Sequence, residues 1–293
     1  MSSAQFFAFV EGGLDRPFYE RVVAKANEGR SVRQQVIAVR EVPGSAGGKV
    51  ALLDLFKRYR KAGHLSATAF GKRLVCVFFA DKDCDDACRR RLRSPHLIYT
   101  ISYDLEGYLY QCGDLHRALA DACGLTGQQS ASLLGDSSNW IKTIVANWKA
   151  WTALCMLSQA QRVNSGSTYD RVSAINPAPL AAHDSALLTQ HKAALARALG
   201  LSPVAIEKLY RRYERLVETS LSSDVPFRYF KGKWLAHLLQ KHLEASPRIP
   251  DASTNAVGEK VITALIAQVA ANGHCKCCAP YMTKVQQLSA SLM

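Results

Sequence analysis

Short apolar runs alternate with amphipathic segments through the first third of the chain. The apolar runs of strand length span residues 5–10, 35–42, 73–80 and 97–103, and residues 73–80 form the most continuous of them. Between these runs, residues 15–27 and 49–61 repeat apolar side chains at helical spacing. Strands that alternate with helices are typical of a parallel sheet with right-handed crossovers. The pattern predicts an α/β fold for this part of the chain.

The character of the sequence changes after residue 114. Long segments rich in Ala, Leu, Gln and Lys replace the short apolar runs. Such segments are typical of helices that bury one apolar face. We therefore expect two domains, an α/β domain over residues 1–114 and a mainly α-helical domain over residues 115–293.

The chain is strongly basic. It has 37 Lys and Arg against 24 Asp and Glu, which gives a formal net charge of +13. A positive field of this size attracts polyanions such as nucleic acid. One predicted helix carries Arg211, Arg212 and Arg215 opposite an apolar stripe. This row is either a solvated helix face or a surface that contacts phosphates, and both interpretations remain open.

The composition, 48% hydrophobic and 21% charged over 293 residues, is that of a globular protein. No apolar run approaches the roughly 18 residues that a membrane span needs, and residues 1–13 lack the basic start of a secretory signal. We therefore expect a cytoplasmic protein with no membrane partner. No Gly-x-x-x-x-Gly-Lys-Ser/Thr motif occurs, so any ATPase must be a separate partner.

Nine cysteines with irregular spacing fit a reducing compartment better than a disulfide framework. One compact group contains His274, Cys275, Cys277 and Cys278. A Cys-x-Cys-Cys sequence is too tight to wrap around a zinc ion by itself. We expect ordinary thiols here, with a zinc site as the alternative.

Carboxylates gather where the predicted strands end. They are Glu11 after the first strand, Asp81, Asp83, Asp85 and Asp86 after the strand over 73–80, and Asp104 and Glu106 after the last. The carboxyl ends of parallel strands meet at one edge of a sheet, where functional groups collect. Crowded carboxylates repel one another, and a hard divalent cation such as Mg²⁺ or Mn²⁺ relieves that repulsion. Helix caps and solvated loops are the alternative explanation of an Asp-x-Asp alone.

These motifs, in this order, resemble those of the TOPRIM nuclease family. They are Phe9-Val10-Glu11-Gly12 with Asp15, Gly47-Gly48-Lys49, Asp81-Lys82-Asp83 and Tyr103-Asp104-Leu105-Glu106. More narrowly, they look like the OLD-like branch that supplies effector subunits of bacterial anti-phage systems, such as the PARIS system, beside an ABC-type ATPase. The segment Tyr229-Phe230-Lys231-Gly232-Lys233-Trp234 resembles a Gly-Lys element of that branch. Two departures are Gly107, where relatives commonly have Asn, and Cys84, where they have a larger apolar residue.

The resemblance implies a TOPRIM-like sheet and a metal-dependent nuclease that cleaves phosphodiester bonds, acting as a toxic effector of anti-phage defence. It implies that Glu11, Asp81 and Asp83 bind Mg²⁺ or Mn²⁺ and are catalytic. Asp85 and Glu106 would hold a second metal ion. Phosphate-binding candidates are Lys49, Lys231 and Lys233, together with the arginine row of the helical part.

The implied partners are nucleic acid, either tRNA or DNA, an ABC-type ATPase subunit and a second copy of the chain in a homodimer. A TOPRIM-like module that binds nucleic acid or the ATPase without cutting is the alternative from a different functional class. The presence of Glu11, Asp81 and Asp83 favours the enzyme.

Overall fold

The computed structural model describes residues 4–69, 71–178, 180–246, 257–271 and 278–292. The chain forms two compact units, each built from more than one segment. The first unit contains Met1–Asp81, Leu92–Thr100 and Ile266–Met293, and the second contains Lys82–Arg91 and Ile101–Leu265. The expected division after residue 114 differs from this one, because the C-terminal segment belongs to the unit that holds the sheet.

The first unit is built on a five-stranded sheet. Its strands are β1 (Ala4–Val10), β2 (Arg33–Ala38), β3 (Ser66–Ala69), β4 (Lys72–Ala80) and β5 (Leu97–Tyr99). The order is β2-β1-β4-β3, and β5 also pairs with β4. All the pairings are parallel except that of β3 with β4. The expected α/β fold with a mainly parallel sheet is confirmed.

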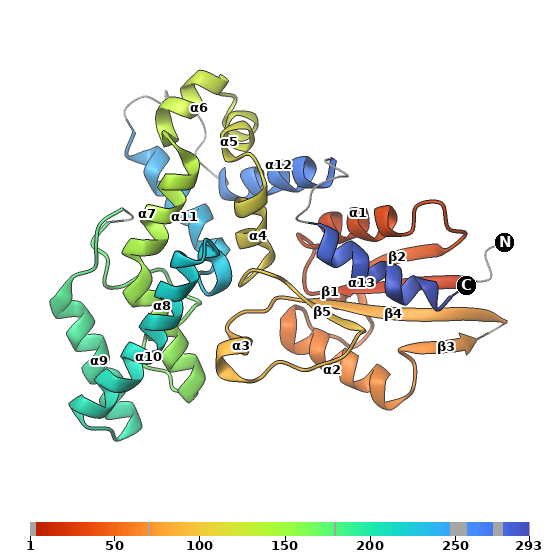
Figure 1. Ribbon diagram of the computed structural model, residues 1–293, viewed down its shortest axis with the longest axis horizontal. Helices are drawn as coiled ribbons and strands as arrows, with labels where there is room; N and C mark the ends of the chain where they lie inside the picture. The colour runs from red at the N-terminus through yellow and green to blue at the C-terminus, as the bar shows by residue number, and fades with distance from the viewer. Residues whose placement is uncertain (1–3, 70, 179, 247–256, 272–277, 293) are drawn as a thin grey trace. The chain divides into compact units, whose positions relative to one another are not determined.

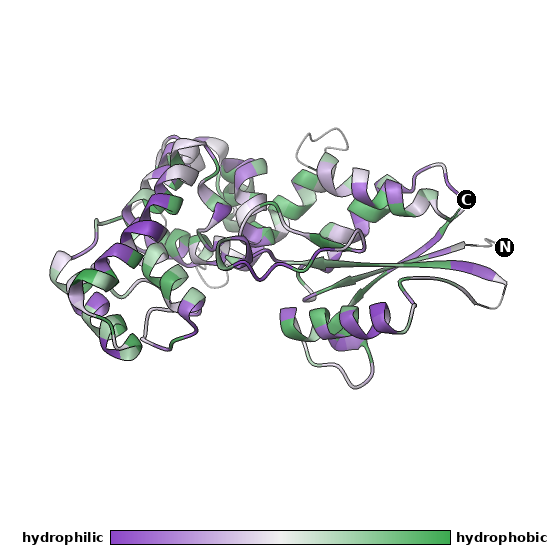
Figure 2. Cartoon of the chain, turned by 60° about the horizontal axis from the view of Figure 1, so that its bottom comes forward, coloured by the Kyte–Doolittle hydropathy of each residue, from purple (hydrophilic) through white to green (hydrophobic). Residues whose placement is uncertain are grey.

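Alternation along the strands supplies apolar side chains to both faces of this sheet. Phe9 and Phe78 stack on each other at 4.8 Å and pack with Phe56 of α2 (Gly48–Lys61). On the other face, α1 (Arg16–Ala26) and α13 (Ala279–Ala290) contact each other. Figure 1 shows α2 on one side of the sheet and α1 with α13 on the other, and Figure 2 shows the apolar strands between these helices.

The strands differ from the expected ones at three places, namely two strand ends and one additional strand. The run over 35–42 leaves the sheet after Ala38 and continues as a 3-10 helix, Val39–Glu41. The run over 97–103 ends as a strand at Tyr99. Strand β3 was not expected, because its Ser and Ala side chains give no apolar signal. An apolar run therefore indicates burial more dependably than it indicates where a strand stops.

The second unit is helical. Its helices are α3 (Asp85–Cys88), α4 (Leu105–Cys112), α5 (Leu115–Cys123), α6 (Gly127–Leu134), α7 (Ser137–Asn147), α8 (Lys149–Gln161), α9 (Ser185–Leu199), α10 (Pro203–Ser222), the 3-10 helix η2 (Pro226–Arg228) and α11 (Gly232–Glu244). Helix α12 (Val257–Ala271) begins in this unit. The central helix is α8, which is buried from Ala150 to Ser158 and packs on α10 (Figure 1). Among the described residues, no helix combines the length and the apolar character that crossing a bilayer requires.

Candidate functional site

Glu11 and Asp81 meet at the carboxyl edge of the sheet. They follow β1 and β4, which are parallel neighbours with Val10 opposite Phe79. The backbone N–H of Asp81 donates a 2.7 Å hydrogen bond to Oε1 of Glu11. Both residues are partly buried. The structure thus brings together two of the three predicted catalytic carboxylates, from positions seventy residues apart in the sequence.

The turn after β1 is held by a third carboxylate. Asp15 occupies the N-cap position of α1 but makes no cap hydrogen bond to that helix. Its Oδ2 instead accepts a 2.9 Å hydrogen bond from the backbone N–H of Gly12. Asp15 therefore occupies the N-cap position while its carboxylate closes the preceding turn.

A buried tyrosine, Tyr19, lies close to the carboxylates of this edge. Tyr19 is 2% exposed and stacks on Phe79 with ring centroids 4.1 Å apart. Burial raises the pKa of its hydroxyl well above the ordinary value, and Tyr281, Asp81, Asp15 and Glu11 raise it further. Three carboxylates therefore lie close enough to this buried hydroxyl to act on it.

The amino end of α2 lies at the same edge. The N–H of Gly48 donates to the backbone carbonyl of Glu11 at 3.2 Å. Gly48 has φ +85°, a left-handed conformation that favours glycine. The ammonium of Lys49 lies 5.8 Å from the centre of the Tyr99 ring. A helix amino end carries partial positive charge and backbone N–H groups that suit a phosphate oxygen.

Asp83, the third predicted catalytic residue, belongs to the second unit, and its backbone is bonded to other segments of that unit. Its φ is +52°, uncommon for a residue with a side chain. Its N–H donates to the carbonyl of Tyr103 at 2.7 Å, and the N–H of Tyr103 donates to the carbonyl of Phe227 at 2.6 Å. These bonds fix the loop after β4 against two segments that are remote in sequence.

Asp104 has a structural role that the sequence did not suggest. It is 1% exposed, and its carboxylate accepts hydrogen bonds from the N–H groups of Gly107 and Gly232, both at 2.9 Å, and of Lys233 at 3.4 Å. Burial, and then Glu106, raise the pKa of Asp104 to about 7 against the lowering effect of these donors and of Lys233. The residue joins the amino ends of α4 and α11.

The Gly-Lys element gains a physical explanation from this junction. A Cβ on Gly232 would lie 2.0 Å from the backbone nitrogen of Gly107. The two segments therefore approach each other so closely that no side chain fits between them. A Cβ on Gly107 would lie 3.0 Å from Cβ of Phe227. Glycine at position 107, where the resemblance leads one to expect Asn, matches this close approach.

The other predicted binding residues have defined contacts. Lys233 lies 3.6 Å from Oε1 of Glu106, which is nearly buried, and Lys231 donates to the carbonyl of Tyr169 at 3.0 Å. Arg211 pairs with Glu207 and Glu214 at 2.8 and 2.7 Å on its own helix. The remaining arginines of that row, Arg212 and Arg215, are exposed. Asp85 begins α3.

Within the described part of the chain, no group of three or more His, Cys, Asp or Glu side chains is arranged to hold a metal ion. Of the His274–Cys278 group, residues 274–277 lie outside the described residues. Cys278 is buried at the start of α13.

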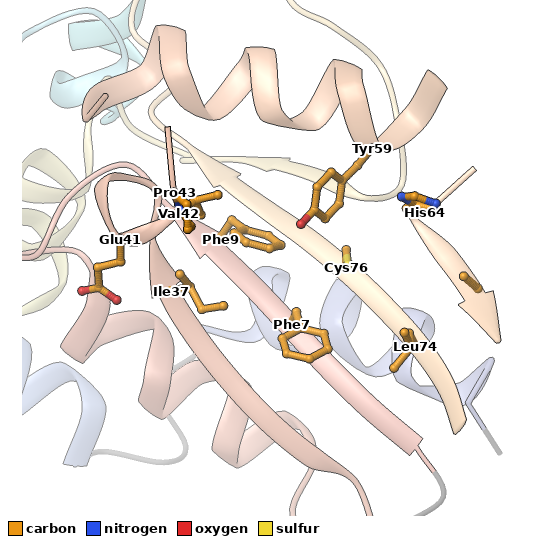
Figure 3. A pocket seen from close by; sticks show the side chains of 11 residues that line it. Phe7, Phe9, Ile37, Glu41, Val42, Pro43, Tyr59, His64, Leu74 and Cys76 are labelled. Carbon is orange, nitrogen blue, oxygen red and sulfur yellow. The ribbon is translucent and has the colours of Figure 1, made fainter. Parts of the chain in front are cut away.

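A hollow of about 500 Å³ lies on the face of the sheet that carries α2. Figure 3 shows its mainly apolar lining, with Phe7, Ile37 and Leu74 along the strands and Tyr59 above them. Glu41, at one end, pairs with Arg16 at 3.1 Å. Neither Glu11 nor Asp81 lines the hollow, so it is a separate feature from the acidic sheet edge.

Sequence reasoning overlooked a second feature of the loop after β4. Arg89, Arg90 and Arg91 follow its aspartates closely, and a run of arginines beside acidic residues was visible in the sequence.

No protein-family model matches this sequence, and a comparison with curated proteins gives no significant match.

Proposed function

We propose that this protein is a metal-dependent nuclease whose reaction centre is built on the sheet edge that carries Glu11 and Asp81. The observation that supports this most is the hydrogen bond from the backbone N–H of Asp81 to Glu11, which ties the Glu11 carboxylate to the backbone of Asp81 at the ends of adjacent parallel strands. Asp81, Asp15 and Glu11 all act on the buried hydroxyl of Tyr19, which is consistent with a site that favours a cation.

The donor set fits a hard divalent cation, because carboxylate oxygens are the ligands that Mg²⁺ and Mn²⁺ prefer. Glu11 and Asp81 would hold the ion. When bound, such an ion would lower the pKa of water and offset negative charge on a phosphate. Asp83 enters the proposal through the resemblance alone, as the residue two positions beyond Asp81.

The protein's own groups then have separate roles. One oxygen of Glu11 is fixed by the Asp81 N–H, which orients the carboxylate to accept a proton from an attacking water. Lys49 and the N–H groups at the start of α2 would bind a non-bridging phosphate oxygen. We leave Glu106 out of the metal site, since Lys233 already balances its charge.

The wider context of the proposal follows the resemblance. It includes a TOPRIM-type fold, a tRNA or DNA substrate, a cytoplasmic location, an ABC-type ATPase partner, a homodimer and a toxic role in anti-phage defence. A non-catalytic module that binds nucleic acid or the ATPase is the second candidate. The lack of a three-ligand group among the described residues favours this second candidate.

A cleavage assay tests the proposal. The purified chain, alone and with its ATPase partner, is incubated with tRNA and with plasmid DNA in Mn²⁺, in Mg²⁺ and in EDTA. We expect metal-dependent cleavage, reduced by on the order of 100-fold or more in Glu11→Gln, which keeps an oxygen acceptor for the Asp81 N–H.

Glu28→Gln is the matched control, because this exposed glutamate of the same unit pairs only at the surface with Lys25. It should cleave like the parent. Equal cleavage by Glu11→Gln and the parent would remove Glu11 from the reaction, and silence in every condition would favour the non-catalytic module.

A further inference from the structure

The loop after β4 is polarised along its length. Its first half contains Asp83, Asp85 and Asp86, and its end contains Arg89, Arg90 and Arg91. An acidic half suits a cation, whereas a cluster of guanidinium groups suits phosphate oxygens. Both kinds of group are needed by a protein that handles phosphodiesters.

Arg90 anchors the arginine end of this loop. Its guanidinium donates to the carbonyls of Gln159 and Ala160, at 2.8 and 3.1 Å, near the carboxyl end of α8. A cation is favoured there by the partial negative charge of the helix end. Because Arg90 is engaged with α8, its neighbours Arg89 and Arg91 are left exposed on a fixed loop.

A third exposed arginine comes from a remote segment of the same unit. Arg228 ends η2 directly after Phe227, whose carbonyl accepts from Tyr103, which in turn accepts from the N–H of Asp83. This chain of backbone hydrogen bonds places Arg228 beside the loop. Its guanidinium lies 5.4 Å from the centre of the Tyr229 ring.

One ion pair links the two halves of the loop. Asp86 pairs with Arg91 at 3.2 Å.

We propose that Arg89, Arg91 and Arg228 bind the phosphodiester backbone of a nucleic acid. Planar guanidinium groups form paired hydrogen bonds to phosphate oxygens, and exposed arginines on a rigid support fix the register of a strand. The inference rests on the proposed function in naming a surface that holds the substrate. The arginine row of α10 is a weaker candidate, since Arg211 pairs with two glutamates, whereas Arg91 pairs with one aspartate.

Binding in EDTA tests the proposal without cleavage. The full-length chain is titrated into fluorescein-labelled single-stranded RNA, single-stranded DNA and duplex DNA, and anisotropy is followed over a range of salt concentrations. We expect the double variant Arg91→Gln with Arg228→Gln to bind on the order of 10-fold more weakly at low salt. The slope of log K against log salt should fall by roughly two units. The three probes distinguish RNA from DNA.

Two matched variants separate the site from net charge and from folding. Arg58→Gln with Arg60→Gln removes two exposed charges from α2 and should change affinity far less. Arg91→Lys with Arg228→Lys keeps the charge and should keep most of the affinity, with the parent melting curve. Equal weakening by the two glutamine pairs, or no binding of any probe by the parent, would overturn the proposal.

The outcome is separable from that of the cleavage assay. Glu11→Gln should bind these probes about as well as the parent does, because the proposed surface is made of Arg89, Arg91 and Arg228 and does not include Glu11. A parent that binds through Arg91 and Arg228 but never cleaves would support this surface and contradict the nuclease. A parent that cleaves, and that binds equally well when both arginines are replaced, would support the nuclease and contradict this surface.

Discussion

Two pairs of carboxylates in this protein look alike in sequence and differ in their surroundings. Glu11 and Asp81 lie partly buried at a sheet edge, where a helix amino end and a third carboxylate accompany them. Asp104 and Glu106 lie almost fully buried, one bonded to backbone N–H groups and the other beside a lysine. We propose that the first pair binds a cation, whereas Asp104 of the second pair joins two helices.

The difference between the pairs shows that a carboxylate that follows a predicted strand can lie either at an accessible sheet edge or at a buried helix start. A parallel strand that ends at an open edge delivers its carboxylate to the solvent boundary, where a ligand can reach it. A buried carboxylate that caps a helix inside a helical unit is instead occupied by backbone N–H groups of the protein itself. The following changes test this distinction, beginning with the largest expected effect.

Asp104→Ala should destabilise the protein by about 3 kcal/mol or more, because it leaves backbone N–H groups of two helices without their buried acceptor. Urea denaturation followed by circular dichroism measures the change. Asp114→Ala is the control, since that exposed aspartate caps α5 by accepting a hydrogen bond from the backbone N–H of Arg117. The control should lose about 1 kcal/mol. Equal losses would contradict the special role of Asp104.

The free energy of unfolding should depend on pH through Asp104. Its pKa is about 7 in the folded protein against 3.8 without the fold, so the folded state keeps a proton that the unfolded state has lost. The contribution therefore falls as pH rises from about 4 to about 7, by up to about 1.4 kcal/mol per pH unit. Denaturation curves of Asp104→Asn over this range should show a flatter dependence than the parent. Identical slopes would contradict the assignment.

Lys233→Met should cost about 1 kcal/mol, because it keeps the apolar stem of the side chain and removes the charge beside the nearly buried Glu106. Lys241→Met is the control, since its partner Glu244 lies at the surface. The double variant Lys233→Met with Glu106→Gln should recover part of the loss. Failure to recover any of it would show that the lysine acts through something other than this glutamate.

Asp81→Asn should leave the metal-free stability unchanged or raise it by up to about 1 kcal/mol, because one of three neighbouring negative charges is removed. Thermal melting in EDTA measures the effect. Asp54→Asn, which breaks an exposed ion pair with Lys57, is the control and should be neutral or slightly destabilising. A large loss from Asp81→Asn would mean that this carboxylate is structural.

The sheet was predictable because its main strands are apolar and its helices are amphipathic. The juxtaposition of Glu11 and Asp81 followed from the same pattern, since parallel strands end at a common edge. Strand β3 was not predictable from small side chains. The place of α13 in the first unit depends on contacts with α1 across most of the chain, such as those of Tyr281 with Tyr19, and local patterns do not report such contacts.

The surroundings of Asp104 and Glu106 in the second unit could not be predicted from the motifs. Asp104 and Glu106 were grouped with the sheet because residues 97–103 look like one strand, but the strand ends at Tyr99 and both acids belong to a helix start. The cap role of Asp104 depends on Gly232, which is 128 residues away. No local signal predicts such a partner.

Calorimetric titration of Mn²⁺ into the parent, Asp81→Asn and Glu106→Gln tests the contrast between the two pairs most directly. Circular dichroism confirms that each variant is folded before titration. We predict that the parent binds Mn²⁺, that Asp81→Asn abolishes this binding and that Glu106→Gln retains it. A parent that does not bind Mn²⁺, or binding that is lost in Glu106→Gln and kept in Asp81→Asn, would contradict the assignment of the metal site to the sheet edge.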